Sequence, residues 1–384
     1  MHSTRYLIIG GGMTGDAAVK GIRERDADGS IVLVGSEQHP PYARPPLTKG
    51  LWSGSEEAKI WRGTESAGAE LRLGRRIVSL DLDGRRATDD AGEEYAWQKL
   101  LLATGGSPRT IPGTDGVVYY RTLDDYRKVR ARVHEGSSAV VIGGGFIGSE
   151  IAASLAANGC RVSMVFPETG VAARVLPAEL SAFVTEEYRR HGVEMLTEET
   201  VEAASAGSVT TGSGQTLEAD VVIAGLGIEP ATDLAEAVGL AVDNGIVVDE
   251  LGRVEAREDV FAAGDVASFP VAVFGRRFRV EHEDHAKSHG RAVGANMAGA
   301  NVPYDHLPFF YSDMFDLGYE AVGEVDSRLE TVESWQEPNR KGIVAYVDET
   351  RRPRGFLYWN VWDHVERGRE LIRAGEPIDE PALV

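Results

Sequence analysis

The sequence predicts an α/β protein with two Rossmann-like dinucleotide-binding domains and a small α+β domain at the C-terminal end. Two stretches, about 130 residues apart, each carry the pattern of strand, glycine-rich turn, helix and second strand. The chain has 384 residues, which is too long for one ordinary core and fits two or three domains. From Pro303 onward the composition shifts towards aromatic residues, which indicates a further, smaller domain.

The second of these stretches, residues 139–168, contains every expected part of such a unit. Its sequence is AVVIGGGFIGSEIAASLAANGCRVSMVFPE. Ala139–Ile142 is an apolar run of strand length, and Arg161–Phe166 is predicted to be the second strand. Phe146–Asn158 is expected to form a helix that stops at Gly159. This is the order of elements that surrounds a dinucleotide in an α/β sheet.

The glycines of this unit have the spacing G-x-G-x-x-G, at Gly143, Gly145 and Gly148. The first permits a tight turn, the second lets a pyrophosphate approach the backbone, and the third lets the helix pack closely on the strand. Glu168 follows Gly148 by twenty residues, where a carboxylate can accept hydrogen bonds from an adenosine ribose. The alternative is a glycine-lined structural turn, but the flanking strand, the helix and the distal acid favour a dinucleotide site.

The same pattern opens the chain. Tyr6–Ile9 reads as a strand, and Glu37 is the distal acid, twenty-two residues after the last glycine. The glycines are Gly10, Gly12 and Gly15. Two nucleotide sites imply a resident cofactor and an exchanging one, as in a flavoprotein that oxidises a nicotinamide.

The composition excludes several classes of function. With a single cysteine, Cys160, the chain has no internal disulfide and no pair of redox cysteines. A net charge of −20 argues against nucleic-acid binding. No apolar run approaches the roughly 18 residues of a membrane span, and a strand at Tyr6 leaves no room for a signal peptide. We therefore expect a soluble, cytoplasmic protein.

Two loops between the predicted strands and helices have the composition of binding loops. Pro40–Lys49 is dense in proline, which stiffens the backbone and suits a loop that holds a flat ring. The alternative there is an exposed polyproline connector. Val260–Asp265 reads as a strand that ends in a small-residue turn with a carboxylate. Asp265 is predicted to accept hydrogen bonds from ribitol hydroxyls, with a helix cap as the alternative.

The remaining pattern supplies the rest of the predicted elements. Strands are expected at residues 71–82, 99–103 and 221–227, a hairpin at 342–347 and 355–361, and helices at 123–134, 285–298 and 364–374. His282, His285 and His289 have the spacing of one helical face, but the chain lacks a distant Cys/His cluster and carboxylates surround them. We therefore expect no metal site.

Eight segments, spread over nearly the whole chain, carry a family resemblance. They are YLIIGGG, PYARPPLTKGLW, LLATGG, GGGFIGSE, VFPE, VFAAGDVA, GRRFRVEHEDHA and FFYSDMFDLGYEAVG. VEHEDHA, FYSD and LGYEA are the specific ones among them. On these segments the chain resembles the FAD-dependent pyridine-nucleotide reductases of the ferredoxin- and rubredoxin-reductase type, within which it looks most like apoptosis-inducing factor and its bacterial relatives.

The resemblance implies a glutathione-reductase-like two-dinucleotide-binding fold with FAD and NAD as cofactors. The FAD-binding domain would comprise residues 1–110 and 231–302, the NAD-binding domain residues 111–230, and the C-terminal α+β interface domain residues 303–384. The implied FAD contacts are Gly10, Gly12, Gly15, Glu37, Arg44, Lys49, Val78, Arg121, Asp265, His282 and Tyr311. The implied NAD contacts are Gly143, Gly145, Phe146, Gly148, Glu150, Glu168, Gly227 and Glu281.

Lys49 and Glu150 are the catalytic residues that the resemblance implies. They are expected to come from different lobes and to pair beside the flavin N5, where they would orient the ring and stabilise charge that develops during hydride transfer. One residue departs from apoptosis-inducing factor: Tyr311 stands where that protein has a Trp that stacks on the nicotinamide. A phenol ring can also stack, with less area.

Two functions follow from the resemblance. The first is an NADH-dependent FAD reductase that passes electrons singly to a small iron–sulfur carrier, ferredoxin or rubredoxin. The second is an oxidase or redox switch like apoptosis-inducing factor, with a long-lived reduced complex and quinone or oxygen as acceptor. An acidic carrier would need a local basic surface, and the sequence leaves homodimerisation open. The basic stretches are Arg72/Arg75/Arg76, Arg127/Lys128/Arg130/Arg132 and Arg351/Arg352/Arg354.

Overall fold

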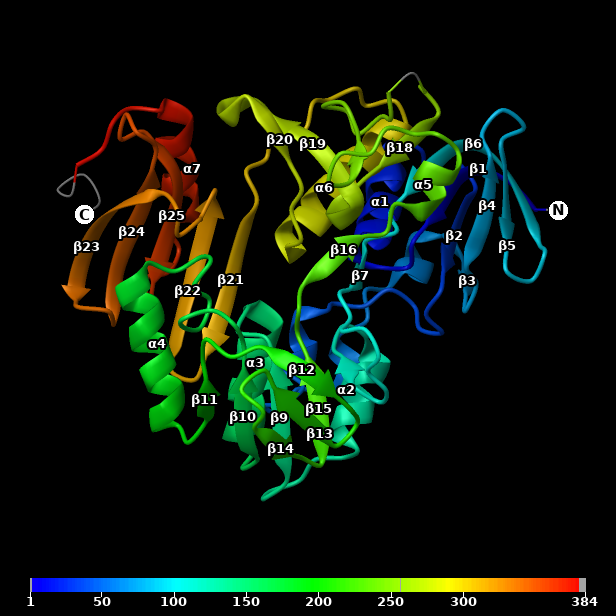
Figure 1. Cartoon of the computed structure of the whole chain (residues 1–384). Helices are drawn as coiled ribbons and strands as arrows, with labels where there is room; N and C mark the ends of the chain where they lie inside the picture. Colours follow the sequence, from blue (N-terminus) through cyan, green and yellow to red (C-terminus); the bar gives the residue numbers. More distant parts are fainter. Residues whose placement is uncertain (1, 256, 380–384) are drawn as a thin grey trace. The chain divides into compact units, whose positions relative to one another are not determined.

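The structure is a computed structural model that describes residues 2–255 and 257–379. Its mixed α/β architecture, with parallel sheets and a small C-terminal sheet, confirms the predicted fold class (Figure 1). The described residues divide into two compact units. Unit 1 comprises residues 1–43, 57–107 and 229–308, and unit 2 comprises residues 44–56, 108–228 and 309–384. The division into three domains stays a prediction.

Unit 1 is built on a sheet whose strands β3, β2, β1, β6 and β18 run parallel in this order. Their bounds are Glu70–Leu73, Ile31–Gly35, His2–Ile9, Glu94–Leu102 and Val260–Ala262; β4 (Ile77–Asp81) and β5 (Arg86–Asp89) extend the sheet antiparallel. A smaller sheet contains β17 (Ile246–Val247), β19 (Ala267–Val271) and β20 (Arg276–Phe278). The apolar run of β1 is buried because a central parallel strand is covered on both faces.

The helices of unit 1 are α1 (Met13–Arg23), α5 (Asp233–Ala237) and α6 (Glu283–Met297), with short 3₁₀ turns at Glu57–Lys59, Thr64–Ala67, Gly264–Val266 and Ala272–Phe274. Glycines allow α1 and α6 to pack very closely. A Cβ atom on Gly21 would lie 2.0 Å from the carbonyl oxygen of Arg291, and one on Gly294 would lie 2.2 Å from that of Ala18. The two helices therefore pack backbone against backbone.

Unit 2 contains a second parallel sheet, in the order β11, β10, β9, β15 and β8. These strands span Glu194–Leu196, Arg161–Val165, Ser138–Ile142, Val221–Ala224 and Val118–Tyr119; the helices are α2 (Leu123–Arg130), α3 (Phe146–Ala157) and α4 (Ala178–Arg190), and a 3₁₀ turn spans Pro45–Leu47. A side sheet holds β12 (Val201–Ala204), β13 (Ser208–Thr211) and β14 (Thr216–Glu218). Strands β7 (Gly106–Pro108) and β16 (Ile228–Pro230) lie where the chain passes between units.

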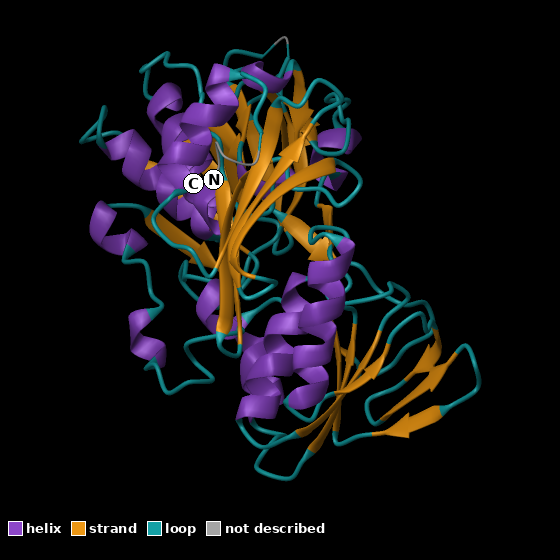
Figure 2. Ribbon diagram, turned by 90° about the vertical axis from the view of Figure 1, so that its left-hand side faces the viewer, coloured by secondary structure: helices purple, strands orange, loops and turns teal. Residues whose placement is uncertain are grey.

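The C-terminal part of unit 2 is an antiparallel sheet in the order β21, β22, β25, β24 and β23, packed against α7. The elements span Phe309–Met314, Leu317–Gly323, Pro353–Trp359, Lys341–Val347, Glu330–Glu337 and Val365–Ala374. Figure 2 colours the strands orange and the helices purple. The aromatic residues that the sequence concentrates here form the interior, with Tyr319, Tyr346, Phe356 and Trp359 fully buried.

The bounds of several elements differ from those expected from the sequence; the strand expected at 221–227, for example, ends at Ala224. Residues 71–82 form two strands, because Gly74 adopts a left-handed conformation (φ 64°) between them. The helix expected at 123–134 ends at Arg130. Within the proline-dense loop, Pro45–Leu47 forms a 3₁₀ turn, so this part is not a polyproline connector. Pro45 and Pro46 fit there because they occupy the first helical positions, which need no backbone donor.

Candidate functional site

The first glycine-rich turn has the geometry of a phosphate cradle. Gly10 takes φ 131°, which only glycine adopts readily, and a Cβ atom on Gly15 would lie 2.2 Å from the carbonyl oxygen of Gly10. By contrast, a Cβ atom on Gly12 would meet no atom within 4 Å. The space above Gly12, at the N-terminus of α1, is therefore open to a ligand, and a helix N-terminus favours an anion there.

Other predicted FAD contacts in unit 1 follow strands of the same parallel sheet. Glu37 comes after β2, and its carboxylate accepts a hydrogen bond of 2.5 Å from the Tyr42 hydroxyl. Asp265 follows β18 within the Gly264–Val266 turn. Since the carboxyl ends of parallel strands meet at one edge, Glu37 and Asp265 lie at the edge that carries Gly12. Val78 lies on β4 and is half exposed.

His282 is the N-cap residue of α6. Desolvation by the surrounding protein lowers the pKa of its imidazole to about 4, although the carboxylates of Asp265 and Asp284 oppose this shift. The ring is therefore neutral at pH 7. Glu281 precedes it, and its carboxylate forms an ion pair of 2.6 Å with the Arg279 guanidinium. Among the described residues, no group of His, Cys, Asp or Glu side chains is arranged to hold a metal ion.

The second glycine-rich turn repeats the first within unit 2. Gly143 takes φ 109°, a Cβ atom on Gly148 would lie 1.9 Å from the carbonyl oxygen of Gly143, and a Cβ atom on Gly145 would meet nothing within 4 Å. A second open cradle thus lies at the N-terminus of α3. Gly227, also a predicted NAD contact, adopts φ 80° and accepts a backbone hydrogen bond of 3.0 Å from Arg109.

Glu168 follows β10, and its carboxylate forms an ion pair of 2.7 Å with the Arg174 guanidinium. The side chain of Arg174 is 85% exposed and that of Glu168 25%. The loop between them is tied to the glycine-rich turn, because the backbone N–H of Ala172 donates to the carbonyl of Gly144 at 2.8 Å. A carboxylate and a guanidinium therefore stand together beside the second cradle.

Arg44 and Arg121, both predicted FAD contacts, lie together in unit 2. The Arg44 guanidinium donates to the backbone carbonyl of Arg121 at 2.8 Å. The backbone N–H of Arg121 in turn donates to the Asp125 carboxylate at 3.1 Å. Thr122 and Asp125 form a capping box at the start of α2. The cap thus fixes the carbonyl that orients Arg44.

Lys49 and Glu150 form an ion pair, with 3.1 Å between Lys49 Nζ and Glu150 Oε1. The side chains are 17% and 9% exposed, so the pair is largely shielded from water. Both residues belong to unit 2, and the expectation that they come from different lobes is wrong with respect to these compact units. Residues 44–56 belong with unit 2 because they pack on α2 and α3, for example through the Trp52 ring beneath Arg130.

Sequence reasoning missed the groups that surround this pair. Glu150 also accepts hydrogen bonds of 2.6 Å from the hydroxyls of Thr48 and Ser312. Lys49 has a second carboxylate partner, Asp313, at 3.2 Å. Thr48 adjoins Lys49, and the other two belong to the FYSD segment, so the motifs contained the residues but gave no sign of their contacts.

Aromatic rings flank the ion pair. The Lys49 ammonium lies 4.2 Å from the centroid of the Tyr311 ring, within cation–π range. Phe146, at the first position of α3, meets Phe310 edge to face at 5.4 Å. Unit 2 therefore gathers Lys49, Glu150 and Tyr311 into one cluster. Glu37, Val78, Asp265, Glu281 and His282 belong to unit 1.

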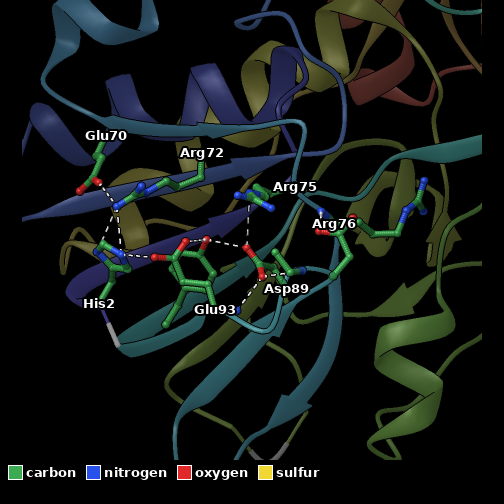
Figure 3. Close-up of polar contacts among 10 residues, drawn as sticks. His2, Glu70, Arg72, Arg75, Arg76, Asp89 and Glu93 are labelled. Carbon is green, nitrogen blue, oxygen red and sulfur yellow. Dashed lines mark hydrogen bonds and ion pairs between the residues drawn. The ribbon is translucent and has the colours of Figure 1, made fainter.

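The basic stretches of the sequence differ in their ion pairing. Figure 3 shows Arg72 and Arg75 among carboxylates in unit 1: Arg72 pairs with Glu70 at 2.6 Å, and Arg75 lies 3.9 Å from Asp89. Arg351 and Arg354 also have carboxylate partners, the latter pairing with Glu324 at 2.6 Å. On and after α2, however, no carboxylate within the described ranges pairs with Lys128, Arg130 or Arg132, all of which are exposed.

Both glycine cradles fit the pyrophosphate of a dinucleotide, because each leaves open the space that a side chain would fill. When bound, FAD supplies a ring that accepts a hydride from a reduced nicotinamide. In unit 1, Gly12, Glu37 and Asp265 would hold FAD, and in unit 2, Gly145 and Glu168 would hold NAD. No helix in the described ranges combines the length and the apolar character needed to cross a membrane.

Comparisons with known proteins agree with this geometry. Residues 4–290 match the family described as pyridine nucleotide-disulphide oxidoreductase, and residues 293–341 match the C-terminal region of mitochondrion-associated apoptosis-inducing factor. The chain is 36% identical to the ferredoxin–NAD⁺ reductase component of the anthranilate 1,2-dioxygenase system of Burkholderia cepacia, over 100% of this chain and 97% of the relative. It is 32% identical to apoptosis-inducing factor 1 of Dictyostelium discoideum, over 98% of this chain and 79% of that protein.

Solved structures give the same result. The chain superposes with a TM-score of 0.91 on a ferredoxin reductase from Rhodopseudomonas palustris, at 29% identity and with 99% of this chain and 97% of the other covered. The TM-score is also 0.91 against putidaredoxin reductase in its covalent complex with putidaredoxin, at 28% identity and with 100% and 96% covered. The chain therefore belongs to the pyridine nucleotide-disulphide oxidoreductase family and is an FAD-dependent oxidoreductase of nicotinamide nucleotides.

Proposed function

We propose that this protein is an NADH-dependent FAD reductase that passes electrons one at a time to a small iron–sulfur carrier, ferredoxin or rubredoxin. The observation that carries the proposal is the combination of two open glycine cradles with one buried cysteine. A dithiol relay needs a pair of cysteines, and Cys160 is the single cysteine of the chain. Electrons that reach the flavin must therefore leave it directly.

In this proposal, Lys49 and Glu150 act beside the flavin. The ammonium of Lys49 would stabilise negative charge that develops on the ring as the hydride arrives, and Glu150 would hold Lys49 in position. The low exposure of both side chains supports this role, because an ion pair shielded from water acts more strongly than an exposed one. Arg44, Arg121, Tyr311 and His282 would line the flavin, and Phe146, Gly227 and Glu281 would contact the nicotinamide nucleotide.

The carrier would dock on the basic surface formed by Arg127, Lys128, Arg130 and Arg132, on and after α2. Small iron–sulfur carriers are usually acidic, and a chain of net charge −20 would repel them at long range. Lys128, Arg130 and Arg132 have no carboxylate partner within the described residues, so their charge is available to such a partner. Arg72, Arg75, Arg351 and Arg354 are already engaged with carboxylates.

Stopped-flow spectroscopy tests the function. NADH should bleach the flavin rapidly, and addition of a ferredoxin or rubredoxin should restore its oxidised spectrum. Carrier-dependent turnover should fall with added salt, which screens charges over about 10 Å at 0.1 M, while flavin reduction by NADH should change much less. Replacing Lys128 and Arg132 with Glu should weaken the carrier's apparent affinity, whereas replacing Arg352 with Glu should not.

A redox switch is the second candidate function, favoured by the match to the apoptosis-inducing factor C-terminal region. In that case the reduced flavin would persist in contact with NAD⁺ and give a long-wavelength charge-transfer band. Slow reoxidation by every one-electron carrier, together with a stable band, would favour the switch over the reductase. Cytoplasmic location and homodimerisation stay predictions, which fractionation and analytical ultracentrifugation would test.

A further inference from the structure

The Glu150 carboxylate is held by groups on both of its oxygens. Oε2 accepts the hydrogen bond from the Thr48 hydroxyl, and Oε1 accepts the hydrogen bond from the Ser312 hydroxyl and also pairs with Lys49. Counted as whole residues, Thr48 is 3% exposed, Ser312 1% and Glu150 7%. Because a carboxylate is planar, partners on both oxygens fix its rotation as well as its position.

The two hydroxyls come from segments that are 264 residues apart in the chain, and each is independently anchored. Thr48 ends the Pro45–Leu47 turn, and its carbonyl accepts a hydrogen bond of 2.6 Å from the Ser154 hydroxyl of α3. Ser312 lies on β21, in register with the buried Tyr319 of β22. Because the backbone of each is anchored, either hydroxyl could follow a moving Glu150 only by rotation about its own Cα–Cβ bond.

Asp313 competes with Glu150 for the ammonium of Lys49. The distances from Lys49 Nζ are almost equal, 3.2 Å to Asp313 Oδ2 and 3.1 Å to Glu150 Oε1. The side chain of Asp313 is 53% exposed, whereas that of Glu150 is 9% exposed. A Glu150 carboxylate free to rotate would lose its alignment with Lys49, and the ammonium would then shift towards the exposed Asp313.

We propose that Thr48 and Ser312 are positioning residues, whose hydroxyls lock the Glu150 carboxylate so that it retains Lys49 against the competing carboxylate of Asp313. This inference rests on the proposed function, in which Lys49 and Glu150 act during hydride transfer. In this proposal neither hydroxyl contacts the cofactor. Their effect on the rate must therefore pass through Glu150.

The test is the rate of flavin reduction at saturating NADH in single variants and in double-mutant cycles. Thr48→Val and Ser312→Ala each remove a hydrogen bond to a charged group, and we expect each to slow reduction about tenfold, with FAD still bound. Thr48→Ser keeps the hydroxyl and should stay close to wild type. Thr211→Val is the matched control, because Thr211 is equally buried in unit 2 but lies on the side sheet.

The cycles separate a positioning role from a general loss of structure. In a Glu150→Gln background, Thr48→Val and Ser312→Ala should cause little further loss, because the group they orient has been altered. Adding Asp313→Asn to Ser312→Ala should recover part of the rate, since the competitor for Lys49 is neutralised. A merely destabilised protein would show neither effect.

Three results would overturn the inference. They are wild-type rates in Thr48→Val and Ser312→Ala, full additivity of either change with Glu150→Gln, and no recovery on adding Asp313→Asn. A wild-type rate in Glu150→Gln itself would instead contradict the role of the ion pair in the proposed function. A slow Glu150→Gln variant beside fast hydroxyl variants would leave that role intact and reject only the positioning residues.

Discussion

Replacing Glu150 with Gln should slow flavin reduction by NADH about 30-fold while leaving FAD bound. The change keeps the shape of the side chain and removes its charge. At 3.1 Å, the attraction between Lys49 and Glu150 is about 5 kcal/mol for an effective dielectric constant of about 20. In Glu150→Gln the ammonium of Lys49 is drawn towards Asp313, at 3.2 Å, but it stays within the cluster, so the barrier rises by only part of this attraction. We expect the activation barrier of hydride transfer to rise by about 2 kcal/mol, which corresponds to a rate about 30-fold lower.

The assay is anaerobic stopped-flow bleaching of the flavin at several NADH concentrations, which separates the limiting rate from the dissociation constant. The limiting rate should fall much more than NADH affinity. Glu187→Gln is the matched control, since Glu187 is a buried carboxylate of unit 2 paired with Arg190 at 2.7 Å and Arg340 at 2.8 Å. A Glu150→Gln variant that is reduced at the wild-type rate, or a Glu187→Gln variant that is slowed equally, would contradict this role of the ion pair.

The other predictions concern the cradles, the nucleotide and pH. Gly145→Ala should leave the melting temperature unchanged and weaken NADH binding, because its Cβ atom enters open space, whereas Gly148→Ala should destabilise the fold. The kcat/KM for NADH should exceed that for NADPH at least about tenfold, because Glu168 repels a 2′-phosphate. Arg174→Ala should widen that ratio, because it removes the guanidinium that lies 2.7 Å from Glu168. Equal kcat/KM values for the two nucleotides would contradict the role of Glu168. Burial lowers the pKa of His282 to about 4 and of His289 to about 3, and that of His285 well below 6.5. The neutral rings therefore stabilise the fold in full above about pH 6.5 and lose that contribution as the pH falls towards 3–4, so the holoprotein should melt at lower temperature at about pH 5 than at about pH 7. His285→Phe, which can still stack on Phe269, should reduce this difference, and an unchanged difference would show that His285 does not contribute.

The dinucleotide units could be predicted from the sequence because their signals are local. The structure shows a steric reason for Gly10 and for Gly15, while at Gly12 it shows open space where a pyrophosphate would fit. The position of Glu37 and Asp265 at one edge of the sheet could also be predicted, because both follow strands and parallel strands present their carboxyl ends at one edge. In these cases a few adjacent residues determine the geometry.

The surroundings of Glu150 could not be predicted, because they depend on contacts between distant segments. Glu150 is 102 residues from Thr48 and 162 from Ser312, and no periodicity records that these side chains meet. The same limit applies to residues 44–56, which precede the NAD-binding stretch in sequence but pack in unit 2. The short break at Gly74 is not predicted by the pattern, because apolar residues stand at Leu71 and Leu73 before it and resume at Ile77 after it.

The central claim is that electrons from NADH leave the flavin singly, to an iron–sulfur carrier. Steady-state NADH oxidation with a panel of ferredoxins, rubredoxin, quinone and oxygen tests it most directly. We predict rapid, salt-sensitive turnover with at least one ferredoxin or rubredoxin and slow turnover with oxygen. Rapid turnover with oxygen or quinone, without turnover on any iron–sulfur carrier, would contradict the claim.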